Sequence, residues 1–224
     1  NLHTLSIVFN EKEFSEDKYQ QLIIKRTNAK HRSFLVTREI FNTYLDDAIA
    51  AMDQPSIDGI NTYFISKYAK EYGLKAVLSG LGADELFGGY PSFQQQKKVR
   101  FVQRFPDKVL RRLQHLPDHR MKKLSYAGLQ HPAAEYLTYR GIYTSNATAQ
   151  LLHLQEPEVE RTLEQIGKNY TLNGLENGNR VSWIETNFYM QNQLLKDSDY
   201  MSMWHGVEIR VPFLDKEVMM MASS

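Results

Sequence analysis

Short apolar segments alternate with amphipathic ones along the first third of the chain. Residues 2–9, 33–36 and 74–78 are apolar or β-branched enough for buried strands, and the segments between them have apolar residues at helical spacing. Parallel strands require crossover connections of this kind. The pattern therefore predicts an α/β fold with a parallel sheet covered by helices on both faces, which makes three layers.

Capping and stop signals predict where these helices begin and end. The first helix is expected to begin at Ser15, and Thr37 is expected to cap the second, which Asp53-Gln54-Pro55 ends. A third helix is expected over residues 60–72, ended by Gly73. Apolar side chains mark one face of the first helix (Tyr19, Leu22 and Ile23) and one of the second (Ile40, Phe41, Tyr44, Leu45 and Ile49).

From Pro91 onward helical spacing dominates, and no further strand is expected. Prolines at 106, 117, 132 and 157 interrupt the helical segments. Residues 91–175 are predicted to form a helical region packed on the sheet, and residues 176–224 are predicted to return to it as helices. The chain thus divides into an α/β part over 1–90 and a helical part over 91–224.

Composition excludes several classes of protein. Hydrophobic residues make up 42% and charged residues 24% of the 224, which is typical of a globular protein. The net charge of +1 gives no reason to expect a nucleic-acid partner. Without cysteine there is no disulfide framework, no thiolate zinc site and no cysteine nucleophile, and the seven histidines form no metal-ligand motif.

The sequence also predicts location and extent. No apolar run approaches the roughly 18 residues of a membrane helix, and Met219-Met220-Met221 is expected to be one buried helical turn. No signal peptide is visible, so a cytoplasmic location is expected. Because the chain begins at Asn1 without methionine and stops soon after an apolar run, it is expected to be a fragment.

The strongest chemical signal is the segment Ser79–Tyr90, with the sequence SGLGADELFGGY, directly after a predicted strand. Ligands of open parallel sheets bind beyond the carboxyl ends of the strands, and glycines at 80 and 82 allow a tight turn that exposes N–H groups to an anion. Asp84 and Glu85 would repel a bare phosphate, but they suit a magnesium ion held between protein and phosphate. The alternative is an ordinary loop leading into a helix whose acidic first turn is favoured by the helix dipole.

This segment resembles the Ser-Gly-x-Gly-x-Asp-Glu-x-Phe-x-Gly-Tyr signature of the asparagine synthetase family. A second resemblance covers Leu194–Met203 and Gly206–Asp215. Asp53-Gln54-Pro55 is similar to the Asp-x-Pro turn of the family, and residues 2–9 fit its second sheet strand. Residues 95–180 carry no specific motif, although the resemblance touches the whole chain.

The resemblance implies a synthetase domain of the pyrophosphatase-loop type, the adenine-nucleotide alpha-hydrolase fold, preceded in the full protein by a glutaminase domain. Such a domain uses ATP and Mg²⁺ to form an acyl-adenylate from a side-chain carboxylate, here expected to be aspartate, and ammonia from glutamine then attacks it. Residues 1–90 would be the nucleotide-binding part. Ile7, Ser79, Gly80 and Gly82 are implied to bind ATP, Asp84 to bind magnesium, and Asp84 and Glu85 to serve in catalysis.

Several features depart from the family pattern. The family's pyrophosphate loop belongs before Leu2, its adenylation lysine lies beyond Ser224, and the glutaminase cysteine is absent, so the chain alone is expected to be inactive. Leu81 stands where asparagine synthetases usually have glutamate. A different carboxylate substrate and a non-catalytic nucleotide-binding paralogue therefore remain alternatives. The oligomeric state is open, with a homodimer as one candidate.

Glu208 and Arg210 are open to two interpretations. Arg210 could clamp a carboxylate or phosphate, or the two residues could form an ion pair that holds the last helices to the sheet. The structural interpretation is favoured, because ion-pair networks often mimic sites.

Overall fold

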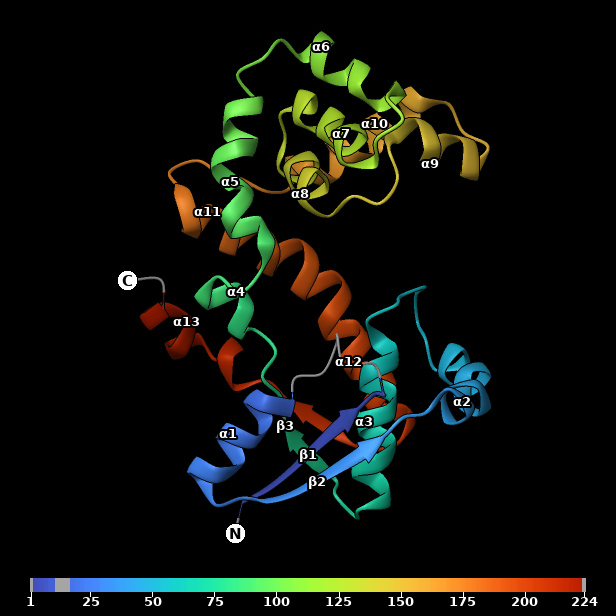
Figure 1. Cartoon of the computed structure of the whole chain (residues 1–224). Coiled ribbons are helices and arrows are strands. Elements are labelled where there is room, and N and C mark those ends of the chain that lie inside the picture. The colour runs from blue at the N-terminus through green and yellow to red at the C-terminus, as the bar shows by residue number, and fades with distance from the viewer. Residues whose placement is uncertain (1, 11–16, 223–224) are drawn as a thin grey trace. The chain divides into compact units, whose positions relative to one another are not determined.

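The computed structural model describes residues 2–10 and 17–222, so the predicted cap at Ser15 lies outside the described residues. The chain folds into two compact units (Figure 1). Unit 1 comprises Asn1–Leu81 and Gln191–Pro212, and unit 2 comprises Gly82–Met190 and Phe213–Ser224. The first boundary follows Leu81 instead of residue 90, and residues 191–212, part of the segment predicted to return to the sheet, belong to unit 1.

Unit 1 contains the strands. Its elements are β1 (His3–Val8), α1 (Asp17–Thr27), β2 (Lys30–Leu35), α2 (Arg38–Ala50), α3 (Gly59–Glu71), β3 (Ala76–Leu78), α12 (Leu195–Trp204) and β4 (Glu208–Arg210). As predicted, Thr37 caps α2, with its hydroxyl oxygen accepting the N–H of Ile40 at 3.3 Å. Gly73 follows α3 with φ +81°, the left-handed conformation that ends many helices.

The strands of unit 1 pair in parallel, as predicted. β1 pairs with β2, with Ser6 opposite Ser33, and β3 pairs with β4, with Val77 opposite Ile209. Within the described residues they form two two-stranded sheets instead of one continuous sheet. The prediction that no strand follows Pro91 was wrong, because residues 208–210 add β4 beside β3.

A polar cluster on one face joins β1 to β2. The ring of His31 lies within hydrogen-bond distance of Thr4 (Nδ1 to Oγ1, 2.9 Å) and of Ser6 (Nε2 to Oγ, 3.1 Å) across the strand pair. Ser33, on the same strand as His31, contacts Nε2 at 2.8 Å. His31 therefore has a structural role in the sheet.

The core of unit 1 lies between β1–β2 and the helices α2, α3 and α12. Its buried side chains are Val36, Ala48, Ala51, Tyr63, Phe64, Tyr68 and Met201, and Phe34 of β2 stacks on Tyr68 at 4.3 Å. The predicted apolar face of α1 does not join this core, because Tyr19 is 71% and Ile23 53% exposed. Ile49, at the end of α2, is also exposed.

Unit 2 is helical, as predicted for the residues after Pro91. Its elements are α4 (Ala83–Phe87), α5 (Pro91–Val102), α6 (Asp107–Arg112), η2 (Leu113–His115), α7 (His119–Lys123), η3 (Leu124–Leu129), α8 (Pro132–Arg140), α9 (Ser145–Leu152), α10 (Glu156–Lys168), α11 (Asn177–Ile184), the π-helix η4 (Glu185–Leu194), η5 (Pro212–Leu214) and α13 (Lys216–Ala222). Of the three boundaries between the units, one follows Leu81 and the other two fall within η4 and η5, so Gln191–Leu194 and Pro212 belong to unit 1. Pro132 and Pro157 occupy the first turns of α8 and α10, where a missing N–H costs little.

Aromatic and branched side chains fill the core of unit 2. Val99, Ala133, Tyr139, Leu172, Val181, Ile184 and Phe188 are buried together. Tyr136 stacks on Phe188 at 5.3 Å and Tyr139 is buried, so both tyrosines of α8 belong to the core of unit 2. None of the helices in the described ranges has both the length and the apolarity needed to span a membrane.

His131 is expected to make unit 2 less stable in mild acid. Its Nδ1 accepts the N–H of Ala134 at 3.2 Å and so caps α8. Burial lowers the pKa of His131, so the unfolded chain takes up the proton first and stability is lost as the pH falls below about 6.5. Asparagine also caps helices but does not titrate there.

The H131N variant should therefore lose about 1 kcal/mol less stability than the parent between pH 7.5 and 5.5. Urea denaturation at the two pH values measures the difference. His205, whose pKa is also lowered by burial, lies in unit 1 and remains in both proteins. An unchanged pH dependence in H131N would show that His131 has no part in it.

Candidate nucleotide and metal site

The first part of the glycine-rich segment belongs to unit 1 and continues β3. The N–H of Ser79 donates to the carbonyl oxygen of Arg210 at 2.8 Å, which extends the β3–β4 pairing by one bond. The Ser79 hydroxyl oxygen accepts the N–H of Leu81 at 3.3 Å and closes a tight turn. Apart from its chain neighbours Ser79 and Leu81, no described residue has a heavy atom within 4 Å of the position that a Cβ on Gly80 would occupy. The backbone at Gly80 is therefore open to a ligand.

A cleft of about 500 Å³ adjoins this turn within unit 1. β1, α3 and β3 form its walls. Among the described residues β1 pairs with β2 and β3 pairs with β4, so β1 and β3 are not paired with each other. Of the predicted nucleotide-binding residues, Ser79 lines the cleft, together with Leu81, whereas Ile7 and Gly80 do not. Ile7 instead packs against the core of unit 1.

Sequence reasoning missed several polar residues of the cleft. Thr62 and Ser66 reach it from α3, and Ser198 reaches it from α12. The Ser66 hydroxyl is buried and has no hydrogen-bond partner in the described part of the chain. Buried hydroxyls normally have a partner, so Ser66 is a candidate to bond an occupant of the cleft.

The second part of the segment belongs to unit 2 and forms the short helix α4. Two glycines in the left-handed conformation bound this helix, Gly82 with φ +95° and Gly88 with φ +76°. A Cβ on Gly82 would lie 2.9 Å from the side chain of Leu214, so Gly82 is required both for its conformation and for space. At the other end, the N–H groups of Gly88 and Gly89 both donate to the carbonyl oxygen of Asp84, at 3.0 Å each.

Asp84 and Glu85 are neighbours in sequence but differ in environment. Asp84 is exposed, and its carboxylate lies so close to Gly89 that a Cβ there would force the carboxylate to move. Glu85 is 1% exposed and accepts a hydrogen bond from the hydroxyl of Tyr90 at 2.8 Å. Burial raises the pKa of Glu85, and its second carboxylate oxygen has no partner in the described part of the chain. Of the two predicted acids, Asp84 alone presents its carboxylate to solvent.

The sequence was compared with protein families and with curated proteins. The sequence model of the family described as "Asparagine synthase" matches residues 1–224. The chain belongs to this family. It is 28% identical to "Asparagine synthetase [glutamine-hydrolyzing] 1" of Bacillus subtilis and 26% identical to a "Putative asparagine synthetase [glutamine-hydrolyzing]" of Mycobacterium bovis. These matches cover 100% and 99% of this chain, but 36% and 35% of the respective relatives.

The family match covers the whole chain, whereas a higher sequence identity to one relative is confined to part of it. A "Putative asparagine synthetase [glutamine-hydrolyzing] 1" of Methanocaldococcus jannaschii is 35% identical over 109 residues, which are 46% of this chain and 20% of that protein. The chain thus spans about a third or less of the length of these relatives, which are glutamine-hydrolysing asparagine synthetases by name.

The acidic helix of this asparagine synthase family member fits a magnesium ion that is bound largely by phosphates. In the described ranges, no group of three or more histidines and acids is arranged to hold a metal without further ligands. Mg²⁺ usually binds through one or two carboxylates together with substrate phosphates and water. The exposed carboxylate of Asp84 fits that requirement, and Glu85 would act from beneath it as a support.

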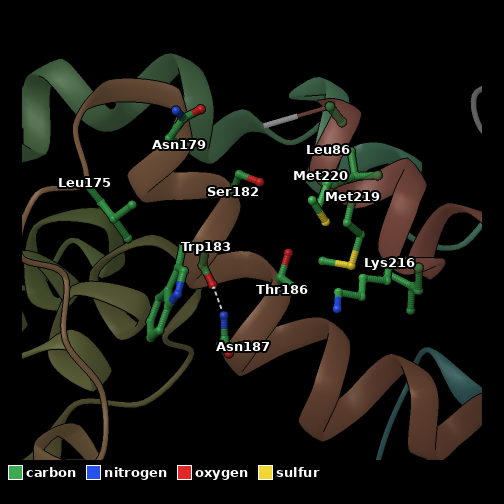
Figure 2. A pocket seen from close by; sticks show the side chains of 12 residues that line it. Leu86, Leu175, Asn179, Ser182, Trp183, Thr186, Asn187, Lys216, Met219 and Met220 are labelled. Carbon is green, nitrogen blue, oxygen red and sulfur yellow. Dashed lines mark hydrogen bonds between the residues drawn. The ribbon is translucent and has the colours of Figure 1, made fainter. Parts of the chain in front are cut away.

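A second pocket, of about 550 Å³, lies in unit 2 beside α4. Leu86 of α4 forms part of its wall, and Figure 2 shows Ser182 and Thr186 extending toward the side formed by Met219 and Met220. Met220 is 62% and Met221 79% exposed, so the prediction that the methionine cluster is a buried turn was wrong. The three methionines lie on a helix, α13, and two of them, Met219 and Met220, border this pocket.

Glu208 and Arg210 form the ion pair that was expected, but within one strand. Nε of Arg210 donates to Oε1 of Glu208 at 2.9 Å, and the two side chains are 63% and 59% exposed. Residues two apart on a strand point to the same face, which explains the contact. The structural interpretation had assumed that the pair holds the last helices to the sheet. The pair instead joins two residues of one strand.

Proposed function

We propose that this chain is the ATP-using part of a glutamine-dependent amidotransferase that converts aspartate to asparagine. The observation that carries the proposal is the open turn that Ser79 and Gly80 form at the carboxyl end of β3, beside the cleft of unit 1. In unit 2, α4 separately presents the exposed carboxylate of Asp84. The family match over 1–224 supports the same assignment.

The proposed reaction has two steps. A carboxylate oxygen of aspartate attacks the α-phosphorus of ATP and pyrophosphate leaves, which forms an aspartyl-adenylate. Ammonia derived from glutamine then attacks the acyl carbon and AMP leaves. Magnesium, when bound, would neutralise charge on the phosphate oxygens. In this scheme the backbone of Ser79 and Gly80 positions the nucleotide, Asp84 would hold the magnesium ion that the phosphates bind, and Glu85 supports Asp84.

We also propose that the two strand pairs are parts of one parallel, three-layer sheet of the pyrophosphatase-loop type in the full protein. The cleft between β1 and β3 supports this proposal, since both strands border it. One further extended segment in that cleft could bond to both. The relatives extend well beyond the matched region, and such a segment could come from there.

Leu81 is the reason to retain a second candidate, the amidation of a carboxylate other than aspartate. Its side chain lines the cleft of unit 1, and leucine can neither move a proton nor pair with a cation. The substrate carboxylate and the incoming ammonia therefore meet no acidic side chain at position 81.

A substrate panel on the full-length protein tests the proposal. With ATP, Mg²⁺ and glutamine, the protein should release AMP and pyrophosphate in equal amounts when aspartate is present, and asparagine should accumulate. Release with another carboxylate instead would favour the second candidate. No release with any carboxylate, despite nucleotide binding, would identify a non-catalytic paralogue.

Fractionation of cells tests the cytoplasmic location proposed with this function, and light scattering tests whether the protein is a homodimer.

The G89A variant should require about tenfold more Mg²⁺ for half-maximal ATP–pyrophosphate exchange, which is the scale of losing support around a metal site. The added methyl group would occupy the position of the Asp84 carboxylate and displace it. Gly178 provides a matched control in the same unit, because a Cβ there meets nothing within 4 Å. A magnesium titration compares G89A, G178A and the parent. Equal Mg²⁺ requirements in all three proteins would show that magnesium binding does not depend on the position of the Asp84 carboxylate.

A further inference from the structure

The helix that carries Asp84 is too short to be stable alone. α4 spans Ala83–Phe87, and helices of this length form in water only when tertiary contacts hold them. Because Asp84 is exposed, its own side chain provides little of that support. The buried face of α4 must therefore fix where the Asp84 carboxylate lies.

Glu85 is the residue of α4 with the most buried polar side chain. Its carboxylate accepts the hydroxyl hydrogen of Tyr90, as described above. Burial raises the pKa of Tyr90, and the Glu85 carboxylate raises it further, so this phenol stays protonated and remains the donor. The position of the Tyr90 ring therefore helps to fix Glu85, and with it α4, through this hydrogen bond.

Arg140, at the end of α8, holds the Tyr90 ring. Its guanidinium carbon lies 4.4 Å from the centre of Tyr90 and 3.6 Å from that of Tyr189, while the two rings meet edge to face at 5.8 Å. Planar guanidinium groups stack well on aromatic faces.

A buried acid in turn orients Arg140. Its Nε donates to Oε2 of Glu185 at 2.6 Å, and Glu185 is fully buried. Oε1 of Glu185 accepts the hydroxyl of Ser92, in the first turn of α5. Burial alone would lower the pKa of Arg140, but Glu185 raises it above its ordinary value, so the guanidinium remains charged.

We propose that Arg140 is a positioning residue for the metal–triphosphate site, acting on Asp84 through Tyr90 and Glu85. The inference rests on the proposed function, in which Asp84 binds the metal that these contacts would help to place. All of these residues belong to unit 2, and none touches the cleft of unit 1. Arg140 lies outside both motif blocks and carries no sequence signal of this role.

The ion pair between Arg180 and Glu135, also in unit 2, serves as a matched control. Nε of Arg180 donates to Oε1 of Glu135 at 2.9 Å, and Glu135 is 3% exposed. Each pair thus combines a half-buried arginine with a buried glutamate. Arg180 also donates to the carbonyl oxygen of Leu172, so within the described residues its hydrogen bonds go to Glu135 and Leu172 and none goes to α4.

The experiment compares R140M and R180M in the full-length protein by two measurements. Hydrogen–deuterium exchange of residues 82–90 without nucleotide should be about tenfold faster in R140M than in the parent and unchanged in R180M. The Mg²⁺ concentration for half-maximal ATP–pyrophosphate exchange should rise about tenfold in R140M alone, with the KM for the carboxylate unchanged.

Two milder variants keep the test decisive if R140M does not fold. R140K retains a cation for Glu185 but loses the planar stacking, and Y90F deletes only the hydroxyl group that Glu85 accepts. Both should shift the Mg²⁺ requirement in the same direction by a smaller factor. Parental exchange in residues 82–90 together with a parental Mg²⁺ requirement in these variants would overturn the proposal. If the parent itself showed no nucleotide-dependent reaction, the proposed function would fail, but the exchange measurement would still report whether Arg140 orders α4.

Discussion

Replacing Asp84 with asparagine in the full-length protein should lower carboxylate-dependent ATP–pyrophosphate exchange by about 100-fold or more, which corresponds to about 3 kcal/mol of lost transition-state stabilisation. The substitution preserves the size of the side chain but removes its negative charge. Asp84 is exposed, whereas Glu85 is 1% exposed and bonded to Tyr90. Glu85 therefore cannot replace the lost carboxylate without rebuilding α4.

The D46N variant is the control for this substitution. Asp46 is an exposed aspartate on α2, in unit 1, and its replacement should leave exchange unchanged. Exchange is measured from the incorporation of labelled pyrophosphate into ATP over a range of Mg²⁺ concentrations. If D84N kept exchange within about threefold of the parent, a difference below 1 kcal/mol, Asp84 would not be the metal-binding residue.

Removing the Glu185 side chain should destabilise unit 2 by about 3–5 kcal/mol, because the change leaves a largely buried cation without its partner. Glu185 is fully buried and pairs with Arg140, whose side chain is 24% exposed. The hydroxyl of Ser92 would also lose its acceptor. E185A should therefore show faster hydrogen exchange in the peptides of α5, α8 and α11.

The double variant E185L/R140M separates the cost of an unpaired charge from the value of the pair. Replacing both partners with apolar side chains removes the isolated cation, so the double variant should be more stable than E185A. Hydrogen exchange of unit 2 peptides, converted to free energies of opening, compares the variants. A loss below about 1 kcal/mol in E185A would place this pair with ordinary surface pairs.

Sequence patterns predicted the elements whose signals are local. Thr37 and Gly73 mark helix ends by their own chemistry, through a side-chain acceptor and a left-handed conformation. Pro132 and Pro157 were expected to interrupt helical segments, and each lies in the first turn of a new helix. These signals depend on a few adjacent residues, so they can be recognised without knowledge of the fold.

β4 was missed because nothing local defines it. Glu208–Arg210 is three residues long and has two exposed charges, and it is a strand because Ala76–Leu78 lies beside it. The burial of Glu85 and the pairing of Arg140 with Glu185 were missed for the same reason. Residues far apart in the sequence determine them, and Asp84 and Glu85 look alike until the fold places one outside and one inside.

The fate of a labelled oxygen tests the central claim most directly. Aspartate labelled with ¹⁸O in its side-chain carboxylate is incubated with ATP, Mg²⁺, glutamine and the full-length protein, and the products are analysed by mass spectrometry. If the carboxylate attacks the α-phosphorus, one ¹⁸O atom must appear in AMP and none in pyrophosphate. Label in inorganic phosphate with ADP as the other product, or unlabelled AMP, would contradict the account.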